Sequence, residues 1–201
     1  EKALQYRNKP GIKLVLEDRP RGKGFAVRNG FKHITGEFVM IQDGDLEYDL
    51  NDYDQLIEPL QKYQQALMLG SRHSNGWKMR QFTDQPLLAL LMNFGQMFFT
   101  SLLNLSMGQC LKDPFTMYKV FRRDCLHGLT FEANRYDFDF ELMIKFLRKG
   151  YRPMEIPVNY RSRSFKEGKK VSLIRDPLLW LRALVKYRFT PLDKQNISEK
   201  E

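Results

Sequence analysis

This chain is poor in the side chains that form covalent cross-links or bind soft metals. Its 201 residues include only two cysteines and three histidines. Cys110 and Cys125 have neither a metal-ligand spacing nor a disulfide-framework pattern, so we expect two ordinary semi-buried residues in a reducing cytoplasm. The scattered histidines exclude a zinc site of the usual spacing and offer no arrangement for a serine nucleophile.

Acidic side chains are also in the minority. Lys and Arg number 33 against 24 Asp and Glu, which gives a formal net charge of +9. This balance favours anionic partners, such as nucleotide phosphates or acidic lipid headgroups, unless it serves only solubility. Nucleic acid is not an expected partner, because no nucleic-acid motif is recognisable and the aromatic residues follow core periodicity.

The length of the chain predicts one domain over residues 1–190 and a polar tail over residues 191–201. Short apolar runs alternate with amphipathic ones, which predicts an α/β fold with a mostly parallel sheet. The expected strands are Ile12–Glu17, Phe38–Gln42, Ala66–Leu69, Tyr118–Arg122 and Met154–Tyr160. The expected helices are Lys2–Arg7 (the end of a helix), Gly24–Ile34, Asp52–Gln65 with Asn51 as N-cap, Phe140–Arg148 and Pro177–Phe189, with a polar loop over Ser74–Asp84.

An acidic segment follows the strand expected at Phe38–Gln42. Asp43 and Asp45 flank Gly44, and a glycine lets the backbone turn sharply, so that both carboxylates converge. The carboxyl end of a strand is where open α/β sheets place their ligands. Carboxylate oxygens suit Mg²⁺ or Mn²⁺, and Asp45 is the expected direct ligand. Asp43 is expected either to bind the ion as well or to contact ribose or metal-bound water, and Glu47 is either a further oxygen ligand or a solvated turn residue. The alternative is an acidic turn in solvent, because the Asp-X-Asp pattern is common.

Residues 85–111 carry no charge and are long enough to span a bilayer. However, four polar residues form one stripe along this segment. They are Asn93, Gln96, Thr100 and Asn104. A core helix or a helix at a membrane surface is therefore favoured over a membrane span.

The stretch Pro177–Phe189 combines leucine and aromatic residues with interleaved Lys and Arg. It is too short to span a membrane. Its composition fits a helix in the plane of the lipid headgroups. It fits equally a helix packed on the sheet with a solvated basic face.

Several motifs occur in the order of a known family. The acidic segment is preceded by the basic, glycine-containing turn Arg19–Lys23. It is followed by Gly70-Ser71-Arg72, Asp113, Tyr118–Arg123, Phe138-Asp139-Phe140-Glu141, Gly150–Val158 and Tyr160–Lys170. Over roughly residues 10 to 190, this series resembles the family 2 glycosyltransferases of the dolichyl-phosphate mannose synthase type.

The resemblance implies a GT-A fold, a Rossmann-like sheet of nucleotide-diphospho-sugar transferases flanked by helices. The family's first strand and nucleotide-binding segment have no counterpart here, so an N-terminally incomplete domain is expected, as a fragment or a natural truncation. The implied activity is metal-dependent, inverting transfer of a hexose from a UDP- or GDP-hexose to a polyprenyl phosphate at the cytoplasmic face of a membrane. The alternative is a truncated, non-catalytic module that binds an anionic membrane or a partner through its basic C-terminal helix.

The resemblance also assigns roles to basic residues. Arg19, Arg21 and Lys23 enter a helix, where amide dipoles and side-chain cations could hold the donor phosphates. Arg72 is a second candidate for the phosphates. In the family, the loop after Tyr160 covers the donor and acceptor phosphates, which implies the same role for Arg163 and Lys169.

Two further carboxylates are implied on the acceptor side. Asp113 is expected to act as general base for a hydroxyl acceptor, or to position groups for a phosphate acceptor that is already ionised. The segment Pro114–Met117 departs from the Met-Glu-Thr-Cys that usually follows this aspartate. Glu141 is expected to orient Arg122 or the acceptor, or else to form a structural ion pair.

Overall fold

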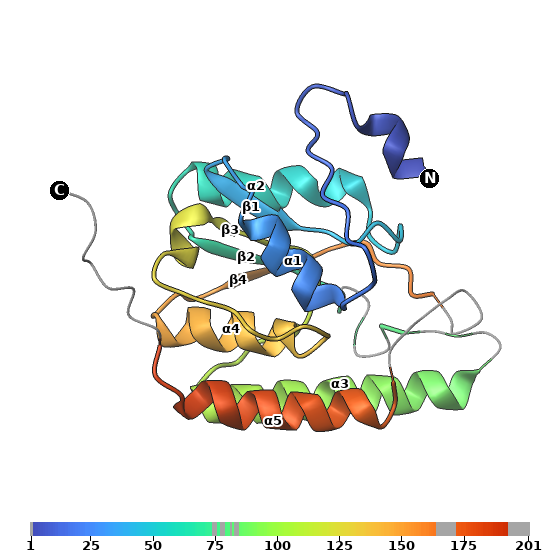
Figure 1. Cartoon of the computed structure of the whole chain (residues 1–201). Coiled ribbons are helices and arrows are strands. Elements are labelled where there is room, and N and C mark those ends of the chain that lie inside the picture. Colours follow the sequence, from blue (N-terminus) through green and yellow to red (C-terminus); the bar gives the residue numbers. More distant parts are fainter. Residues whose placement is uncertain are drawn as a thin grey trace.

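A computed structural model describes residues 2–73, 76, 79, 80, 82, 85–163 and 172–192. Within these residues a four-stranded sheet lies among five α-helices (Figure 1). The strands are β1 (Phe38–Ile41), β2 (Leu67–Ser71), β3 (Lys119–Arg122) and β4 (Met154–Pro157). The α-helices are α1 (Lys23–Phe31), α2 (Tyr53–Gln61), α3 (Pro86–Met107), α4 (Phe138–Arg148) and α5 (Arg175–Phe189). Short 3-10 helices are η1 (Lys2–Tyr6), η2 (Leu50–Asp52) and η3 (Arg123–Leu126).

The α/β class is confirmed, but the prediction of a mostly parallel sheet is wrong. The strand order is β1-β3-β2-β4, and β3 runs antiparallel to both of its neighbours. Only β2 and β4 pair in parallel among the described strands. Apolar spacing identifies a strand but not its direction, which depends on the end of the sheet at which the chain re-enters. In this chain the strand direction reverses between β2 and β3, which α3 connects, and again between β3 and β4, which α4 connects.

The strand expected at Ile12–Glu17 is absent, and this segment has no regular secondary structure. Leu16 is 61% exposed, and β1 forms the edge of the described sheet, with β3 on its inner side and no described strand on its outer side. A single extended segment without a partner leaves its backbone groups unpaired, so its apolar spacing alone does not make a strand.

The cap expected for α2 is also wrong. Asn51 lies inside η2, and its backbone N–H donates to the Asp49 carboxylate at 2.9 Å. The 3-10 turn displaces the start of the α-helix to Tyr53, and Asp52 instead accepts a 2.6 Å hydrogen bond from the backbone N–H of Asn159. Most of the polar loop expected over Ser74–Asp84 lies outside the described residues, as does the tail from residue 193.

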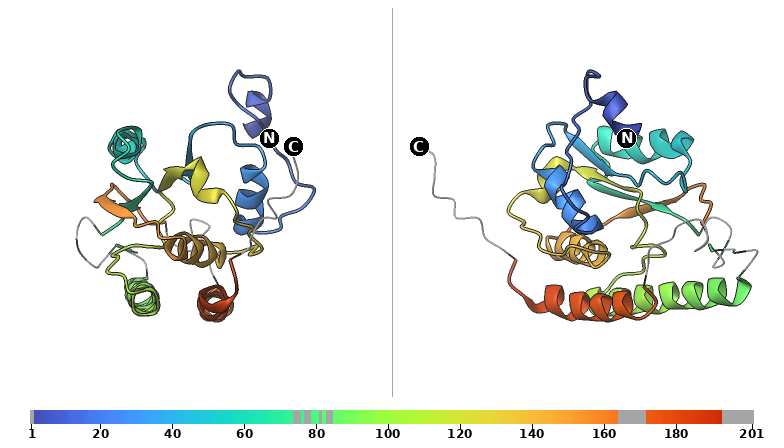
Figure 2. Two further views of the ribbon diagram at one scale, coloured as in Figure 1. Left: turned by 90° about the vertical axis from the view of Figure 1, so that its left-hand side faces the viewer. Right: turned by 45° about the vertical axis from the view of Figure 1, so that its right-hand side comes forward.

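Helix α4 is the centre of the hydrophobic core. It is buried from Phe138 to Leu147, and it lies between the sheet and an outer layer formed by α3 and α5 (Figure 2). Its apolar residues pack against strand residues such as Phe121, whose ring meets that of Phe146 edge-on. The burial of a whole helix explains why its charged residues have internal partners.

The polar stripe of α3 faces the domain. Asn93 bonds to the backbone of Arg80, Gln96 donates to Asp113, and Asn104 bonds to the backbone of Leu111. By length and composition α3 could cross a membrane, and 22% of its most apolar stretch is buried. The inward polar stripe leaves apolar side chains on the outer face of α3. They include Leu87, Leu90, Phe94, Phe98 and Leu105.

We expect Gly70→Ala to lower the free energy of unfolding by about 1–3 kcal/mol, because a Cβ there would force neighbouring atoms apart. It would lie 2.8 Å from Val158 Cγ1 and 2.9 Å from Tyr118 Cβ. Urea denaturation measures the effect. The matched control is Gly30→Ala in α1, where a Cβ meets nothing within 4 Å and helix propensity favours alanine. Equal stability of the two variants would contradict this account of β2 packing.

Candidate active site

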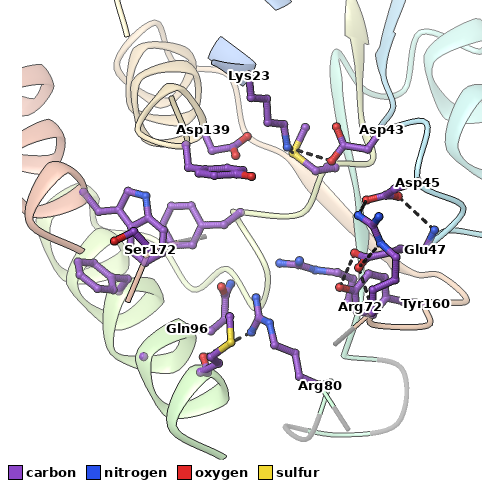
Figure 3. A pocket seen from close by; sticks show the side chains of 18 of the residues that line it. Lys23, Asp43, Asp45, Glu47, Arg72, Arg80, Gln96, Asp139, Tyr160 and Ser172 are labelled. Carbon is purple, nitrogen blue, oxygen red and sulfur yellow. Dashed lines mark hydrogen bonds and ion pairs between the residues drawn. The ribbon is translucent and has the colours of Figure 1, made fainter. Parts of the chain in front are cut away.

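One large cavity, of about 680 Å³, lies at the end of the sheet where the segment after β1 faces helices α3, α4 and α5. Charged side chains gather on one part of its lining, where Asp43, Asp45, Glu47 and Arg72 follow β1 and β2 (Figure 3), and most of the apolar lining comes from α3, α4 and α5. The charged residues include Lys23, Asp43, Asp45, Glu47, Arg72, Arg80, Asp139 and Arg163. The apolar residues include Leu91, Met92, Phe99, Phe115, Phe140, Leu173 and Trp180. Its volume is that of a site for an organic ligand.

The acidic segment after β1 lines this cavity, as the sequence predicts, although its turn differs from the expected one. Gly44 has an ordinary negative φ, whereas Leu46 adopts a left-handed φ of 61° and is 83% exposed. The Asp45 carboxylate accepts a 3.2 Å hydrogen bond from the backbone N–H of Glu47 and so closes the turn around Leu46. A non-glycine residue held in this conformation is strained, which is common at functional sites.

The carboxylates of Asp45 and Glu47 converge on one cation. The Arg163 guanidinium is 2.6 Å from Asp45 Oδ2 and 3.2 Å from Glu47 Oε1. The Tyr160 hydroxyl donates to the other oxygen of Glu47 at 2.8 Å. Nearby, Lys23 Nζ lies 3.1 Å from Asp43 Oδ2. The segment therefore holds its carboxylates beside positive groups at the wall of the cavity.

This donor set fits a hard divalent cation. Among the described residues, no group of three or more His, Cys, Asp or Glu side chains gathers around one point. Asp45 and Glu47 nevertheless already share one position for positive charge, which the guanidinium of Arg163 takes. Two carboxylates with further oxygens from phosphates and water are the usual Mg²⁺ environment in nucleotide sites.

Asp113 lies behind the cavity and binds Arg72 rather than lining the wall. Its carboxylate accepts from the backbone N, Nε and Nη2 of Arg72 at 2.9, 2.8 and 2.7 Å. Gln96 donates to it at 3.2 Å, and Glu155 accepts from its backbone N–H at 2.6 Å. Burial alone would raise the pKa of Asp113, but the attraction and hydrogen bonds of Arg72 outweigh burial and lower that pKa. These contacts are those of a carboxylate that positions Arg72.

Arg80 lines the cavity and was missed by sequence reasoning. Its backbone N–H and C=O bond to the side chain of Asn93 at 3.1 and 3.0 Å, which anchors this segment to α3. Its buried Nε has no hydrogen-bond partner among the described residues. Burial and the neighbouring positive charge of Arg72 lower the pKa of Arg80. No motif identifies this arginine, because its place depends on the inward face of α3.

The remaining predicted phosphate ligands do not all reach the cavity. Lys23 lines it, but Arg19 and Arg21 are exposed and are not among its lining residues. The Arg21 guanidinium instead lies over the Phe25 ring, 4.8 Å from its centroid. Lys169 lies outside the described residues.

Glu141 forms a structural cluster inside the domain. Its carboxylate accepts from the backbone N–H groups of Glu132 and Ala133 and lies 2.9 Å from Lys145 Nζ. It is fully buried and does not line the cavity. Arg122 pairs with Glu37 and Asp124 instead. Of the two expectations for Glu141, the geometry favours the structural ion pair.

Comparison with known protein families identifies the class of this domain. Residues 1–129 match the model of glycosyl transferase family 2. The chain therefore belongs to glycosyl transferase family 2.

Proteins similar to this chain include a dolichol-phosphate mannosyltransferase and a dolichyl-phosphate beta-glucosyltransferase. The chain is 25% identical over 169 residues to a dolichol-phosphate mannosyltransferase of Pyrococcus furiosus, covering 84% of this chain and 46% of that protein. It is 24% identical over 193 residues to a dolichyl-phosphate beta-glucosyltransferase of Saccharomyces cerevisiae, covering 90% of this chain and 56% of that protein. The chain thus spans about half the length of these relatives.

Solved structures support the GT-A fold. Glucosyl-3-phosphoglycerate synthase from Mycobacterium tuberculosis, crystallised with Mn²⁺, UDP and phosphoglyceric acid, aligns with a TM-score of 0.57 at 20% identity. The alignment covers 88% of this chain and 57% of that structure. The shared arrangement is that of an α/β glycosyltransferase domain with a mixed sheet.

We expect Asp113→Asn to lower the free energy of unfolding by about 3–5 kcal/mol at neutral pH, because it leaves the buried guanidinium of Arg72 without a counter-charge. The pKa of Asp113 is lowered in the folded chain, so its contribution is complete above the unfolded-state pKa and is lost as the pH falls through the folded-state pKa. Denaturation of both proteins at several pH values tests this.

The control for this variant is Glu58→Gln, which removes an exposed ion pair with Lys62 on α2. No measurable change in stability is expected there, since exposed pairs contribute little. A stability difference between native protein and Asp113→Asn that does not narrow at acid pH would contradict the assigned role of the buried pair.

Proposed function

We propose that this domain transfers a hexose from a nucleotide sugar to a polyprenyl phosphate, with inversion at the anomeric carbon and with Mg²⁺ or Mn²⁺. One observation carries the proposal. A single cavity joins a charged wall that includes Asp43, Asp45 and Glu47 to an apolar wall from α3 and α5. A nucleotide diphosphate suits the charged wall, and a polyprenyl chain suits the apolar one.

The donor diphosphate is assigned to the side of the acidic segment. Asp45 and Glu47, with Asp43, are the proposed protein ligands of the divalent cation, which would neutralise the charge that develops on the leaving diphosphate. Lys23 and Arg163 already lie beside these carboxylates and supply further positive charge. Of the predicted phosphate ligands, Lys23, Arg72 and Arg163 line the cavity and are retained in this proposal.

The acceptor phosphate is assigned to Arg72 and Arg80. Both guanidiniums line the cavity, and the hydrogen bonds of Arg72 to Asp113 use Nε and Nη2 rather than Nη1. Two cations with a buried, unpartnered Nε on Arg80 favour an anion between them. A phosphate is ionised near pH 7 and needs no general base, so Asp113 acts by holding Arg72. A phosphate oxygen then attacks the anomeric carbon as the bond from that carbon to the diphosphate oxygen breaks.

The lipid chain of the acceptor is assigned to a membrane under α3 and α5, at its cytoplasmic face. Helix α5 and the residue before it carry a row of exposed apolar side chains, namely Ile174, Leu178, Leu181, Val185 and Phe189. Arg175 and Arg182 are exposed on the same helix. Apolar side chains beside basic ones are typical of helices that lie at an anionic membrane surface. Two dolichyl-phosphate glycosyltransferases among the relatives support this choice of acceptor.

We expect Asp45→Asn to weaken the binding of Mn²⁺ with UDP or GDP at least about tenfold, because it removes a ligand charge while keeping the shape of the side chain. Isothermal titration calorimetry measures the effect. Asp54→Asn, on the exposed face of α2, is the control and should bind as the native chain does. Equal affinity of Asp45→Asn and native chain would remove Asp45 from the proposed site.

A second candidate function is a non-catalytic module that binds an anionic membrane, which the apolar and basic face of α5 favours. Both functions predict membrane binding, but only the transferase predicts metal-dependent binding of nucleotide. Flotation without nucleotide binding would therefore support the second candidate.

The exposed apolar row of α5 is the proposed membrane-binding surface. We expect the double variant Leu178→Ser/Val185→Ser to lower the partition of the protein onto anionic liposomes about tenfold, because two apolar side chains no longer enter the lipid. Flotation with phosphatidylserine vesicles measures the partition. The control is Ile12→Ser/Leu16→Ser, which changes two exposed apolar residues far from α5 in sequence. Equal flotation of the two double variants would contradict a membrane face on α5.

A further inference from the structure

Asp139 is a buried carboxylate in the cavity wall that the proposed transfer does not yet use. It lies in the first turn of α4 and is 6% exposed. Its Oδ1 accepts a 3.1 Å hydrogen bond from Nζ of Lys119, which is fully buried and also bonds to the backbone C=O of Thr116. No hydrogen bond among the described residues uses the other oxygen, Oδ2. The carboxylate is therefore held rigidly with one oxygen still able to accept.

Asp139 borders the part of the cavity assigned to the diphosphate. Figure 3 places Asp139 and Asp43 on either side of the Lys23 amine, which is 3.1 Å from Asp43 Oδ2. In a nucleotide sugar the hexose is bonded directly to the diphosphate. The hexose must therefore occupy space adjacent to that end of the cavity, which Asp139 lines.

An aromatic surface forms another part of the lining of the same cavity. The rings of Phe115 and Phe140 are stacked, with centroids 4.1 Å apart and an interplanar angle of 26°, and both residues line the cavity. Trp180 lines it as well, and its buried Nε1 has no partner among the described residues. A rigid acceptor, aromatic faces and an unpartnered donor in the lining of one cavity suit a ligand that has both hydroxyls and an apolar C–H face. A hexose has both.

We propose that Asp139, with the stacked rings of Phe115 and Phe140, forms the hexose subsite and that its free carboxylate oxygen accepts hydrogen bonds from sugar hydroxyls. This assignment rests on the proposed transferase function. Lys119 acts as a positioning residue, because its ammonium fixes the carboxylate without entering the cavity lining. A buried carboxylate strongly favours a sugar whose hydroxyl donates to it over a sugar that lacks this hydroxyl, because the second sugar leaves the buried charge unpaired.

The experiment compares the affinity for a nucleotide with that for its nucleotide sugar. Calorimetry with Mn²⁺ uses UDP against UDP-glucose and GDP against GDP-mannose on the full chain. We expect the native chain to bind one nucleotide sugar more tightly than its nucleotide, and Asp139→Asn to reduce that advantage about tenfold. Affinity for the nucleotide alone should stay unchanged. The asparagine amide oxygen can still accept from Lys119, which preserves the fold.

Two controls separate sugar recognition from a structural effect. Asp137→Asn removes a carboxylate two residues earlier that does not line this cavity, and it should behave as the native chain. Lys119→Met/Asp139→Asn removes both members of the buried pair. If Asp139 binds the hexose, this double variant should still lack the higher affinity for the nucleotide sugar. If the double variant regains that higher affinity, the loss in Asp139→Asn came from the unpaired lysine, and the proposal is overturned.

The remaining outcomes are also decisive. An unchanged sugar advantage in Asp139→Asn, or equal weakening of nucleotide and nucleotide sugar, would overturn the hexose subsite and leave the transferase proposal standing. Failure of the native chain to bind any nucleotide with Mn²⁺ would overturn the proposed function and this subsite with it.

Discussion

The buried ion pair between Arg72 and Asp113 is the contact on which the arrangement of the cavity depends. It joins the end of β2 to the segment before β3, and Gln96 from α3 and Glu155 from β4 bind the same aspartate region. Separate elements therefore converge on one carboxylate. Because a buried charge without its partner is strongly unfavourable, this convergence restrains all of them together. It also keeps one guanidinium at the cavity wall.

The cavity combines two chemical environments, one charged and one apolar. Its strand side holds carboxylates and cations at hydrogen-bonding distance, and its helix side offers hydrocarbon and aromatic rings. Helices α3 and α5, which supply part of this apolar lining, also carry exposed apolar side chains outside the cavity. A ligand with a charged head and a long apolar chain could lie across the cavity and this surface without exposing either part to the wrong medium.

Much of the fold and part of the site could be predicted from the sequence. The helices at α1, α2, α4 and α5 and the strands β1 to β4 fall where apolar spacing places them, because burial on one face leaves a periodic trace. Asp43, Asp45 and Glu47 line the cavity because they directly follow a buried strand. Arg80 and Asp139 were not assigned to the site, since their positions depend on contacts with Asn93 and Lys119 that local sequence does not encode.

The sequence by itself determined the kinds of elements, the acidic turn after β1 and the amphipathic character of α5. Each of these follows from residues that are neighbours along the chain. Only the tertiary structure decided that β3 runs antiparallel, that residues 12–17 form no strand and that Asp113 faces Arg72 instead of the cavity. Strand direction, strand pairing and the partner of a buried charge are settled between distant segments, where the packing of one restricts the choices of the other.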